Sequence, residues 1–299
     1  SDGQYFGGWG GSMDGVVAAL SCLTGPQDTV HLVARVGDTD LPSFVQYVQK
    51  RYGPQFDCSW LVPDPLGTNH HDAVFQEESE SVRITRVVEP IHEAELFPAL
   101  VLGADAVIFN SGDIDTYDSS LIAQVKRTYP KTTVFVDVHR KVDAVDDSLQ
   151  IFHSGWQGWE DALSHADVVQ MNRKECGALL GKKIDSIEEA ESAAHIVMDR
   201  GVPRVLLTLG GDGCIVGIGH LVRRIPVMKY GRLVDISGAG DAMGVGFVVS
   251  YTGGRSALEA ARYGSAMAAV TCSKLGYPVP GDVDMDMLDA VIEEAQRHW

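Results

Sequence analysis

Basic residues are scarce in this sequence. Among its 299 residues, 24 are Lys or Arg, 41 are Asp or Glu, and the formal net charge is -17. Nucleic acids and anionic membrane surfaces are bound through clustered Lys and Arg side chains. Neither is therefore expected as the principal partner of this protein.

Paired cysteines and long apolar runs are missing as well. No apolar run is long enough to span a bilayer, and the opening SDGQYFGGWGG lacks the basic and apolar regions of a signal peptide. The cysteines are odd in number and scattered, which fits reduced thiols and predicts neither a zinc site nor a disulfide framework. These features predict a cytoplasmic protein; the five cysteines are Cys22, Cys58, Cys176, Cys214 and Cys272.

Short apolar runs alternate with amphipathic segments along the chain. Such runs predict the strands of a buried, mostly parallel sheet in βαβ units. The runs are VHLVARVG (30–37), DAVIFNSG (105–112), TVFVDV (133–138), DVVQMN (167–172) and RVLLTLGG (204–211). Ligands of such sheets bind at the carboxyl ends of the strands, where Asn110, Asp137, Asn172 and Thr208 are expected.

The segments between these runs have helical periodicity. The clearest, 186–201, opens with a Ser-x-x-Glu capping box and closes on glycine. Further helices are expected at 11–23, 41–52, 119–129, 240–251, 256–275 and 286–297. Between 57 and 90, alternating β-branched residues instead predict two or three antiparallel strands that project from one main domain covering 1–299.

The segment DISGAGDAMG (235–244) is the most specific local pattern. Gly238 and Gly240 allow a ligand to approach the backbone closely, and a helix that begins there directs its unpaired N–H groups at an anion. Asp241 beside that anion is either a helix cap or a group that removes a proton from a substrate.

Two further motifs precede it. Asn172-Arg-Lys-Glu175 follows the strand DVVQM, where Glu175 could hold a hydrated Mg²⁺; a solvated helix start gives the same pattern. Thr208-Leu-Gly-Gly-Asp-Gly213 is a glycine-rich turn that suits the phosphates or ribose of a nucleotide, and equally a hairpin leading into CIVGI (214–218).

Taken together and in this order, these motifs resemble the ribokinase-like, or pfkB-type, carbohydrate kinase family. The early Gly10-Gly11, the VARVGDTD segment (33–40) and VDVHRK (136–141) are similar to further family motifs, so the resemblance runs from about residue 10 to about 280. It implies a Rossmann-like, three-layer α/β/α fold with a central mostly parallel sheet. It also implies a small β-sheet lid, placed at 57–90 together with 1–10, and phosphoryl transfer from ATP with Mg²⁺ to a hydroxymethyl group.

The resemblance assigns roles residue by residue. Asp241 corresponds to the catalytic base, and the amides of Gly238, Ala239 and Gly240 to the anion hole. Asn172 and Glu175 match the motif that organises Mg²⁺ and phosphate. Thr208, Gly210 and Gly213 match nucleotide contacts, and Asp235 matches a monovalent-cation site that takes K⁺. Substrate contacts are expected from Gly11, Ser12, Gly15, Asn110, Asp137 and Arg140.

The sequence departs from the family pattern at two places. Members usually open with a strand whose aspartate binds the sugar, but Gly10-Gly11 stands almost at the start here. Either the sequence given is shortened, or the protein lacks that strand and its aspartate. Gly15 replaces an asparagine that is common in the family, which alters recognition of a sugar hydroxyl.

Three readings follow for the function. The first is a kinase for a small sugar-like substrate, with lid strands that pair two subunits as a hypothesis. The second is a nucleotide- or sugar-binding pseudokinase. The third is a nucleoside or hydroxymethylpyrimidine kinase of the same superfamily; hydroxymethylpyrimidine kinases often carry a cysteine in the anion-hole loop, where this chain has Ser237-Gly238-Ala239.

Overall fold

A computed structural model gives the fold of the chain. It describes residues 12–68, 71–76, 79–84, 88–101, 103–110, 116–139, 143–145 and 151–298. The predicted site residues Gly11 and Arg140, and the 1–10 part of the predicted lid, lie outside these ranges. Ser12 is described only as the first residue of a helix.

A six-stranded sheet forms the centre of the molecule, in the order β14-β13-β12-β11-β8-β7. The four strands from β12 to β7 are parallel, and β13 pairs antiparallel with both of its neighbours. Four of the five apolar runs in the sequence therefore form the parallel core of this sheet, as predicted. The strands are β7 (Ala106–Asn110), β8 (Thr133–Asp137), β11 (Val168–Asn172), β12 (Arg204–Thr208), β13 (Cys214–Ile218) and β14 (Leu221–Ile225).

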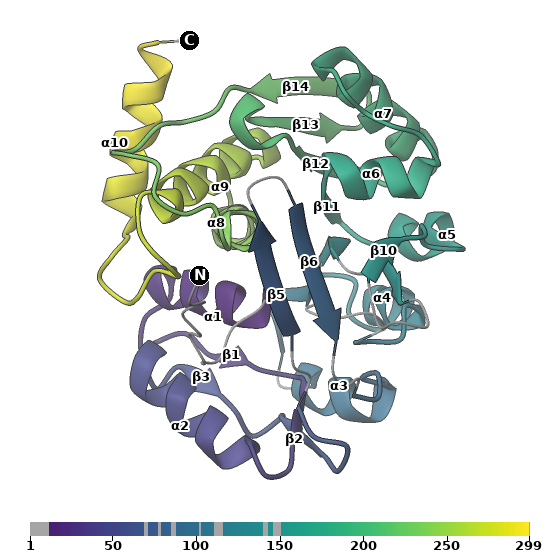
Figure 1. Cartoon of the computed structure of the whole chain (residues 1–299), viewed down its shortest axis with the longest axis vertical. Helices are drawn as coiled ribbons and strands as arrows, with labels where there is room; N and C mark the ends of the chain where they lie inside the picture. The colour runs from purple at the N-terminus through teal and green to yellow at the C-terminus, as the bar shows by residue number, and fades with distance from the viewer. Residues whose placement is uncertain are drawn as a thin grey trace.

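Helices cover both faces of this sheet and make three layers (Figure 1). One layer contains α3 (Glu93–Leu100), α4 (Ser120–Thr128), α5 (Trp159–Ser164), α6 (Arg173–Leu180) and α7 (Ile187–Asp199). The other contains α1 (Ser12–Leu23), α8 (Ala239–Thr252), α9 (Ala257–Cys272) and α10 (Met285–Gln296).

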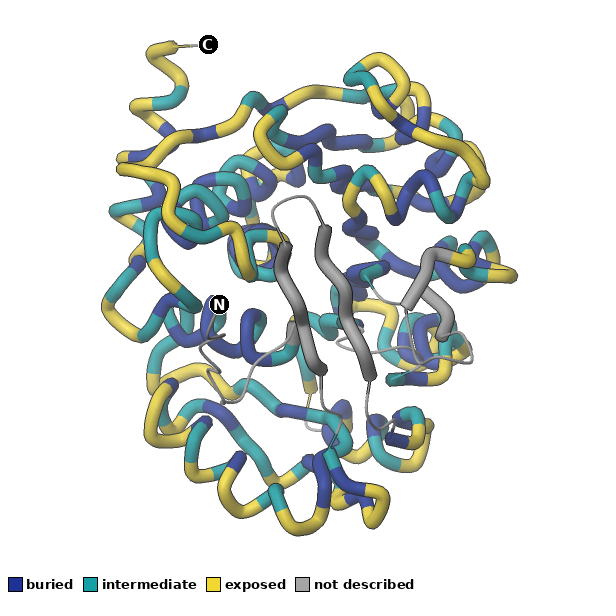
Figure 2. Tube along the Cα trace, in the orientation of Figure 1, coloured by how far each residue is buried: buried dark blue, intermediate teal, exposed yellow. Residues whose placement is uncertain are grey.

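Alternation along the strands fills the two cores. In β8, Val134 and Val136 pack toward the α4 side, whereas Phe135 packs toward α8. Figure 2 shows buried residues toward the inside of the molecule and exposed residues on its outer turns. Strands β8, β11 and β12 are buried along most of their length. The same alternation decides which strand-end side chains face α8, and it places the functional groups described below on one face.

The segment 30–37 is not a strand of the central sheet, which corrects the prediction. It forms two short strands, β1 (Val30–His31) and β2 (Arg35–Gly37). They pair in parallel with β3 (Phe56–Asp57) and β4 (Val62–Asp64) respectively. The run is divided because the intervening turn, in which Leu61 N–H bonds to Cys58 O, separates its two partner strands.

The region 57–90 is antiparallel only in part. Its sole antiparallel pair among the described residues is β5 (His71–Gln76) with β6 (Ser79–Ile84), which runs across the middle of the view in Figure 1. A second small antiparallel pair joins β9 (Asp143–Val145) and β10 (Ile151–His153).

Helix α2 (Leu41–Tyr52) has the bounds that the sequence predicts. None of the helices in the described ranges has the length and apolar character needed to cross a membrane.

Candidate active site

The carboxyl edge of the central sheet gathers polar side chains from four strands. In the register of the sheet, Asn110 lies opposite Asp137, and Asn172 lies opposite Thr208. Gln170 on β11 also lies opposite Asp137. Because side chains alternate along a strand, all five face the same side of the sheet as Phe135 and Leu206, which is the side that α8 covers. The predicted strand ends therefore do meet at one edge.

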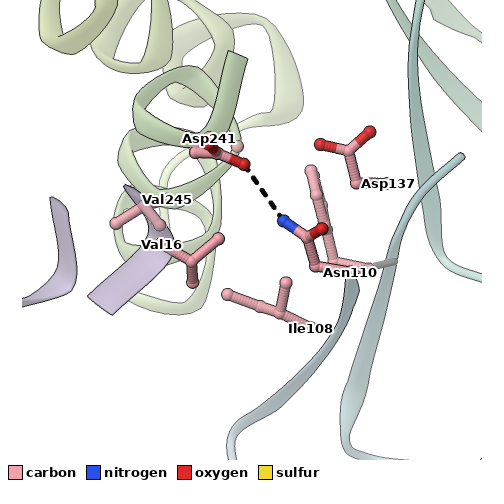
Figure 3. A pocket seen from close by; sticks show the side chains of 8 residues that line it. Val16, Ile108, Asn110, Asp137, Asp241 and Val245 are labelled. Atoms are coloured by element: carbon pink, nitrogen blue, oxygen red, sulfur yellow. Dashed lines mark hydrogen bonds between the residues drawn. The ribbon is translucent and has the colours of Figure 1, made fainter. Parts of the chain in front are cut away.

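Asp241 stands in the first turn of α8 and faces this edge. The side-chain amide of Asn110 donates a hydrogen bond of 3.1 Å to Asp241 Oδ1, shown as the dashed line in Figure 3. A narrow pocket lies here, and its lining includes Val16, Ile108 and Asp137. A carboxylate held in this way, beside a helix N-terminus, can orient a hydroxyl group and accept its proton.

Gly15 is the close neighbour of Asp241 from α1. A Cβ atom at Gly15 would clash with Asp241 Oδ2 and lie 3.0 Å from its Cγ. The resemblance places Gly15 among the substrate contacts, at a position where the family commonly has asparagine. The structure gives a direct reason for a glycine here. Only the missing side chain lets α1 approach the Asp241 carboxylate this closely.

The turn before α8 leads the chain into a helix whose N-terminus lies at this edge of the sheet. Gly238 adopts φ +74°, in the left-handed region that suits glycine, and α8 continues for 14 residues. A helix N-terminus of this kind presents N–H groups and a positive dipole end. Of the three predicted amides, that of Ala239 is bonded to Ile236 O at 3.2 Å. An anion must therefore compete for it or bind chiefly through the neighbouring N–H groups.

Tyr277, which follows α9, packs against this turn. A Cβ at Gly238 would lie 2.5 Å from Tyr277 Cε1, so the ring occupies the space beside the glycine. Burial raises the pKa of the Tyr277 hydroxyl, and the Asp241 carboxylate adds to the effect. The phenol is therefore neutral over the physiological range.

Asp235 joins the same two loops. Its carboxylate accepts hydrogen bonds from Ser237 N at 2.9 Å and from Gly276 N at 3.2 Å. Although partial burial opposes it, the hydrogen bonds from Ser237 and Gly276 lower the pKa of Asp235. In the structure Asp235 therefore links the turn before α8 to the loop that carries Tyr277. The predicted cation role stays a prediction.

Asp137, the last residue of β8, is buried at the carboxyl edge of the sheet. Burial, reinforced by the Glu175 and Asp241 carboxylates, raises its pKa to about 7. His139 lies 3.7 Å from Glu175 Oε1 and is the one non-glycine residue with positive φ among those described, at +32°. Although burial opposes it, the facing carboxylates, Glu175 foremost, raise the pKa of His139 to about 9. The cluster thus holds one cationic imidazole among carboxylates.

Glu175 serves as a helix cap in this structure. Its two carboxylate oxygens accept from Asn172 N at 2.6 Å and from Asn172 Nδ2 at 2.7 Å. Asn172 Oδ1 in turn accepts from the amides of Lys174 and Glu175, which completes a capping box. The motif does start a helix, but Glu175 is buried and not solvated as the alternative interpretation expects. The capping bonds leave lone pairs of this buried carboxylate for a cation.

The glycine-rich motif at 208–213 is a hairpin turn. It joins β12 to β13 through a 3-10 turn at Gly210–Asp212, with Leu209 N bonded to Gly213 O at 2.8 Å. A Cβ at Gly213 would clash with Ile225 O, so packing against β14 already requires this glycine. Thr208 and Gly210 stand at the carboxyl edge, where a nucleotide could approach.

The structure adds Gln170, His139 and Tyr277 to the predicted set. Alternation along DVVQMN could have found Gln170, because it shares the parity of Asn172. His139 follows Asp137 by two residues. No local signal marks Tyr277, since its contact with Gly238 joins segments 39 positions apart.

The carboxylates suit a hydrated hard cation better than a closed metal cage. No group of three or more His, Cys, Asp or Glu side chains in the described ranges forms a metal site. Mg²⁺ characteristically takes one or two carboxylates and keeps waters and phosphate oxygens as its other ligands. Glu175 and Asp137, both buried at the carboxyl edge, fit this pattern.

Comparison with known proteins agrees with this geometry. Residues 141–280 match the model of the pfkB family carbohydrate kinases. The chain is similar to ribokinase of Haemophilus influenzae, with 31% identity over 120 residues. That match covers 39% of this chain and only 38% of the relative.

Solved structures extend the likeness of fold to nearly the whole chain. Arabidopsis thaliana ribokinase, complexed with ribose and ATP, matches with a TM-score of 0.74 at 20% identity, over 95% of this chain and 87% of its own. A pyrophosphate-dependent myo-inositol-1 kinase, converted by mutation into a myo-inositol-3 kinase, matches with a TM-score of 0.75 at 18% identity, over 98% and 94%. At these identities the structures show the fold alone.

Proposed function

We propose that this chain, which belongs to the ribokinase-like, or pfkB, family of carbohydrate kinases, transfers a phosphoryl group to a hydroxymethyl group of a small sugar-like molecule. The observation that carries the proposal is the position of Asp241. Its carboxylate stands at the N-terminus of α8, is held by Asn110, and faces the carboxyl edge of the sheet. Acceptor hydroxyl and transferring phosphate would meet between these elements.

Asp241 would act as the base in this reaction. Phosphoryl transfer requires positioning and charge stabilisation more than covalent chemistry. The carboxylate orients the acceptor hydroxyl and takes its proton as the oxygen attacks phosphorus. The hydrogen bond from Asn110 to Oδ1 helps to fix the orientation of this carboxylate.

The N-terminal turn of α8 would stabilise the transferring phosphate. Its N–H groups and dipole favour negative charge where the charge develops. Glu175, assisted by Asp137, would hold Mg²⁺, which would supply positive charge beside the donor phosphates. Such local positive charge is needed because the chain itself carries a net charge of -17.

ATP is the proposed donor, bound near Thr208 and Gly210. Pyrophosphate is the alternative donor, because the myo-inositol-1 kinase that shares this fold is pyrophosphate-dependent. The hairpin β5–β6 would act as the lid that excludes water, and so suppress donor hydrolysis. Pairing of these strands between two subunits is a further proposal, which light scattering can test.

The decisive assay measures donor consumption against a panel of sugars, sugar acids, polyols, nucleosides and hydroxymethylpyrimidine. Mg-ATP and Mg-pyrophosphate are tested separately, for the wild type and Asp241→Asn. Acceptor-dependent turnover that Asp241→Asn lowers by three orders of magnitude or so supports the base role, since an acid–base group contributes about 10²–10⁴-fold. Turnover retained in Asp241→Asn excludes it.

A matched control separates the base role from a helix-cap role. Asp284 caps α10 by accepting a hydrogen bond from Met287 N at 2.8 Å. Asp284→Asn should leave turnover unchanged while lowering stability slightly. Binding of Mg-ATP without turnover for any acceptor would instead favour the pseudokinase.

A further inference from the structure

Gln170 is a buried polar residue in a central strand of the sheet, and the proposed reaction gives it no role. It lies on β11 between β8 and β12 and is 2% exposed. Its Nε2 donates two hydrogen bonds, to Asp137 Oδ2 at 2.9 Å and to Gly240 O at 3.0 Å. One amide group thus connects the strand-end carboxylate to the anion-binding turn of α8.

The orientation of this amide follows from its partners. A carboxylate and a backbone carbonyl are both acceptors, so the nitrogen and not the oxygen must face them. The helix comes close enough for this contact because residue 244 is a glycine. A Cβ at Gly244 would lie 3.4 Å from Gln170 Nε2 and 3.1 Å from Phe135 Cζ.

The oxygen of the same amide makes no compensating hydrogen bond among the described residues. Gln170 Oε1 is buried and has no hydrogen-bond partner in the part of the chain that the structure describes. An unsatisfied buried polar atom costs about 1–3 kcal/mol. A residue that served packing alone would be apolar here, like its neighbours Val169 and Met171, which are fully buried on the other face.

The bond to Gly240 has a geometric consequence for the site. The carbonyl of Gly240 and the N–H of Asp241 belong to one planar peptide unit and point in opposite directions. Fixing the carbonyl toward β11 therefore directs the Asp241 N–H away from the sheet interior, and it fixes the Cα from which the Asp241 side chain extends.

We propose that Gln170 is a positioning residue: it ties the first peptide units of α8 to Asp137, and so sets the direction of both the anion-binding N–H groups and the Asp241 carboxylate. The inference rests on the proposed kinase function. It assigns Gln170 an effect on phosphate binding and on turnover, and no contact with the acceptor.

The test compares Gln170→Met, which keeps the length of the side chain and removes the amide, with Met171→Leu, a volume-conserving change on the opposite face. Thermal unfolding confirms folding first. We expect Gln170→Met to lower kcat about 10- to 100-fold, as small misplacements of reacting groups do, with the acceptor KM almost unchanged. Met171→Leu should leave both constants near those of the wild type.

A second readout does not depend on turnover. The dissociation constant of Mg-ATP, or of Mg-pyrophosphate if that is the donor, is measured by calorimetry, and Gln170→Met should weaken binding several-fold. If Gln170→Met fails to fold, the smaller Gln170→Ser replaces it. A folded variant with unchanged kcat and unchanged donor affinity overturns the proposal. Absence of turnover in the wild type refutes the kinase function instead, and the donor affinity still decides the role of Gln170.

Discussion

Gly15 and Asp241 lie in van der Waals contact across the α1–α8 interface, and the carboxylate fills the space that a side chain at residue 15 would need. We predict that Gly15→Ala displaces the Asp241 carboxylate and lowers kcat about 10- to 100-fold. Alanine otherwise favours a helix interior by about 1 kcal/mol, so the variant should stay folded. Steady-state kinetics with a melting curve test this, and a variant with wild-type kcat would show that α1 can move aside.

Asn110 should control the orientation of Asp241. Asn110→Ala removes the 3.1 Å hydrogen bond to Asp241 Oδ1, and we expect kcat to fall about tenfold with a smaller change in donor affinity. Asn110→Asp places a second carboxylate beside Asp241 and should be more harmful, because like charges repel at this distance. Equal activity of the two variants would show that charge at residue 110 is unimportant.

Asp137 should make stability depend on pH. Its pKa is about 7 in the folded protein, raised first by burial, and about 3.9 in an unfolded chain. Between these values the folded protein holds a proton that the unfolded chain has released. The contribution of Asp137 to stability therefore falls as pH rises from about 4 to about 7. Asp137→Asn removes this loss, so the Tm of the variant relative to the wild type should rise by several degrees from pH 5 to pH 8.

Asp57 supplies a control with the opposite sign. Although partial burial opposes it, hydrogen bonds from Ser59, His31 and Trp60 lower its pKa to about 2. This contribution to stability is present above about pH 4 and is lost only as pH falls through 2. Asp57→Asn should therefore destabilise the protein by the same amount at pH 5 and pH 8. If the Tm difference between Asp137→Asn and the wild type is also the same at pH 5 and pH 8, burial does not raise the pKa of Asp137.

The central layer of the fold was largely predictable from local sequence patterns. Apolar runs gave the four parallel strands with their polar ends, and capping and periodicity gave α2, α7 and α8 within a residue or two. The division of 30–37 into two strands was not predictable, because it depends on pairing with distant residues 56–64. Likewise, the Gly-Ala-Gly-Asp motif indicates an anion site. The supports of that site, Gln170 and Tyr277, come from segments that only the folded chain brings near it.

Glu175 is the residue at which the cap and the metal roles can be separated. Both of its oxygens accept hydrogen bonds from Asn172, and glutamine at the same position can still accept one in a capping box. Glu175→Gln should therefore stay close to the wild type in Tm but need about 10-fold more Mg²⁺ for half-maximal turnover, because the charge is gone. Glu175→Ala removes the cap too and should lower stability by about 1 kcal/mol. The capping glutamate of α7, Glu189, is the matched control: Glu189→Gln should leave the Mg²⁺ requirement unchanged. If Glu175→Gln also leaves the requirement unchanged, Glu175 is only a cap, and the cation must be held by other groups at the carboxyl edge.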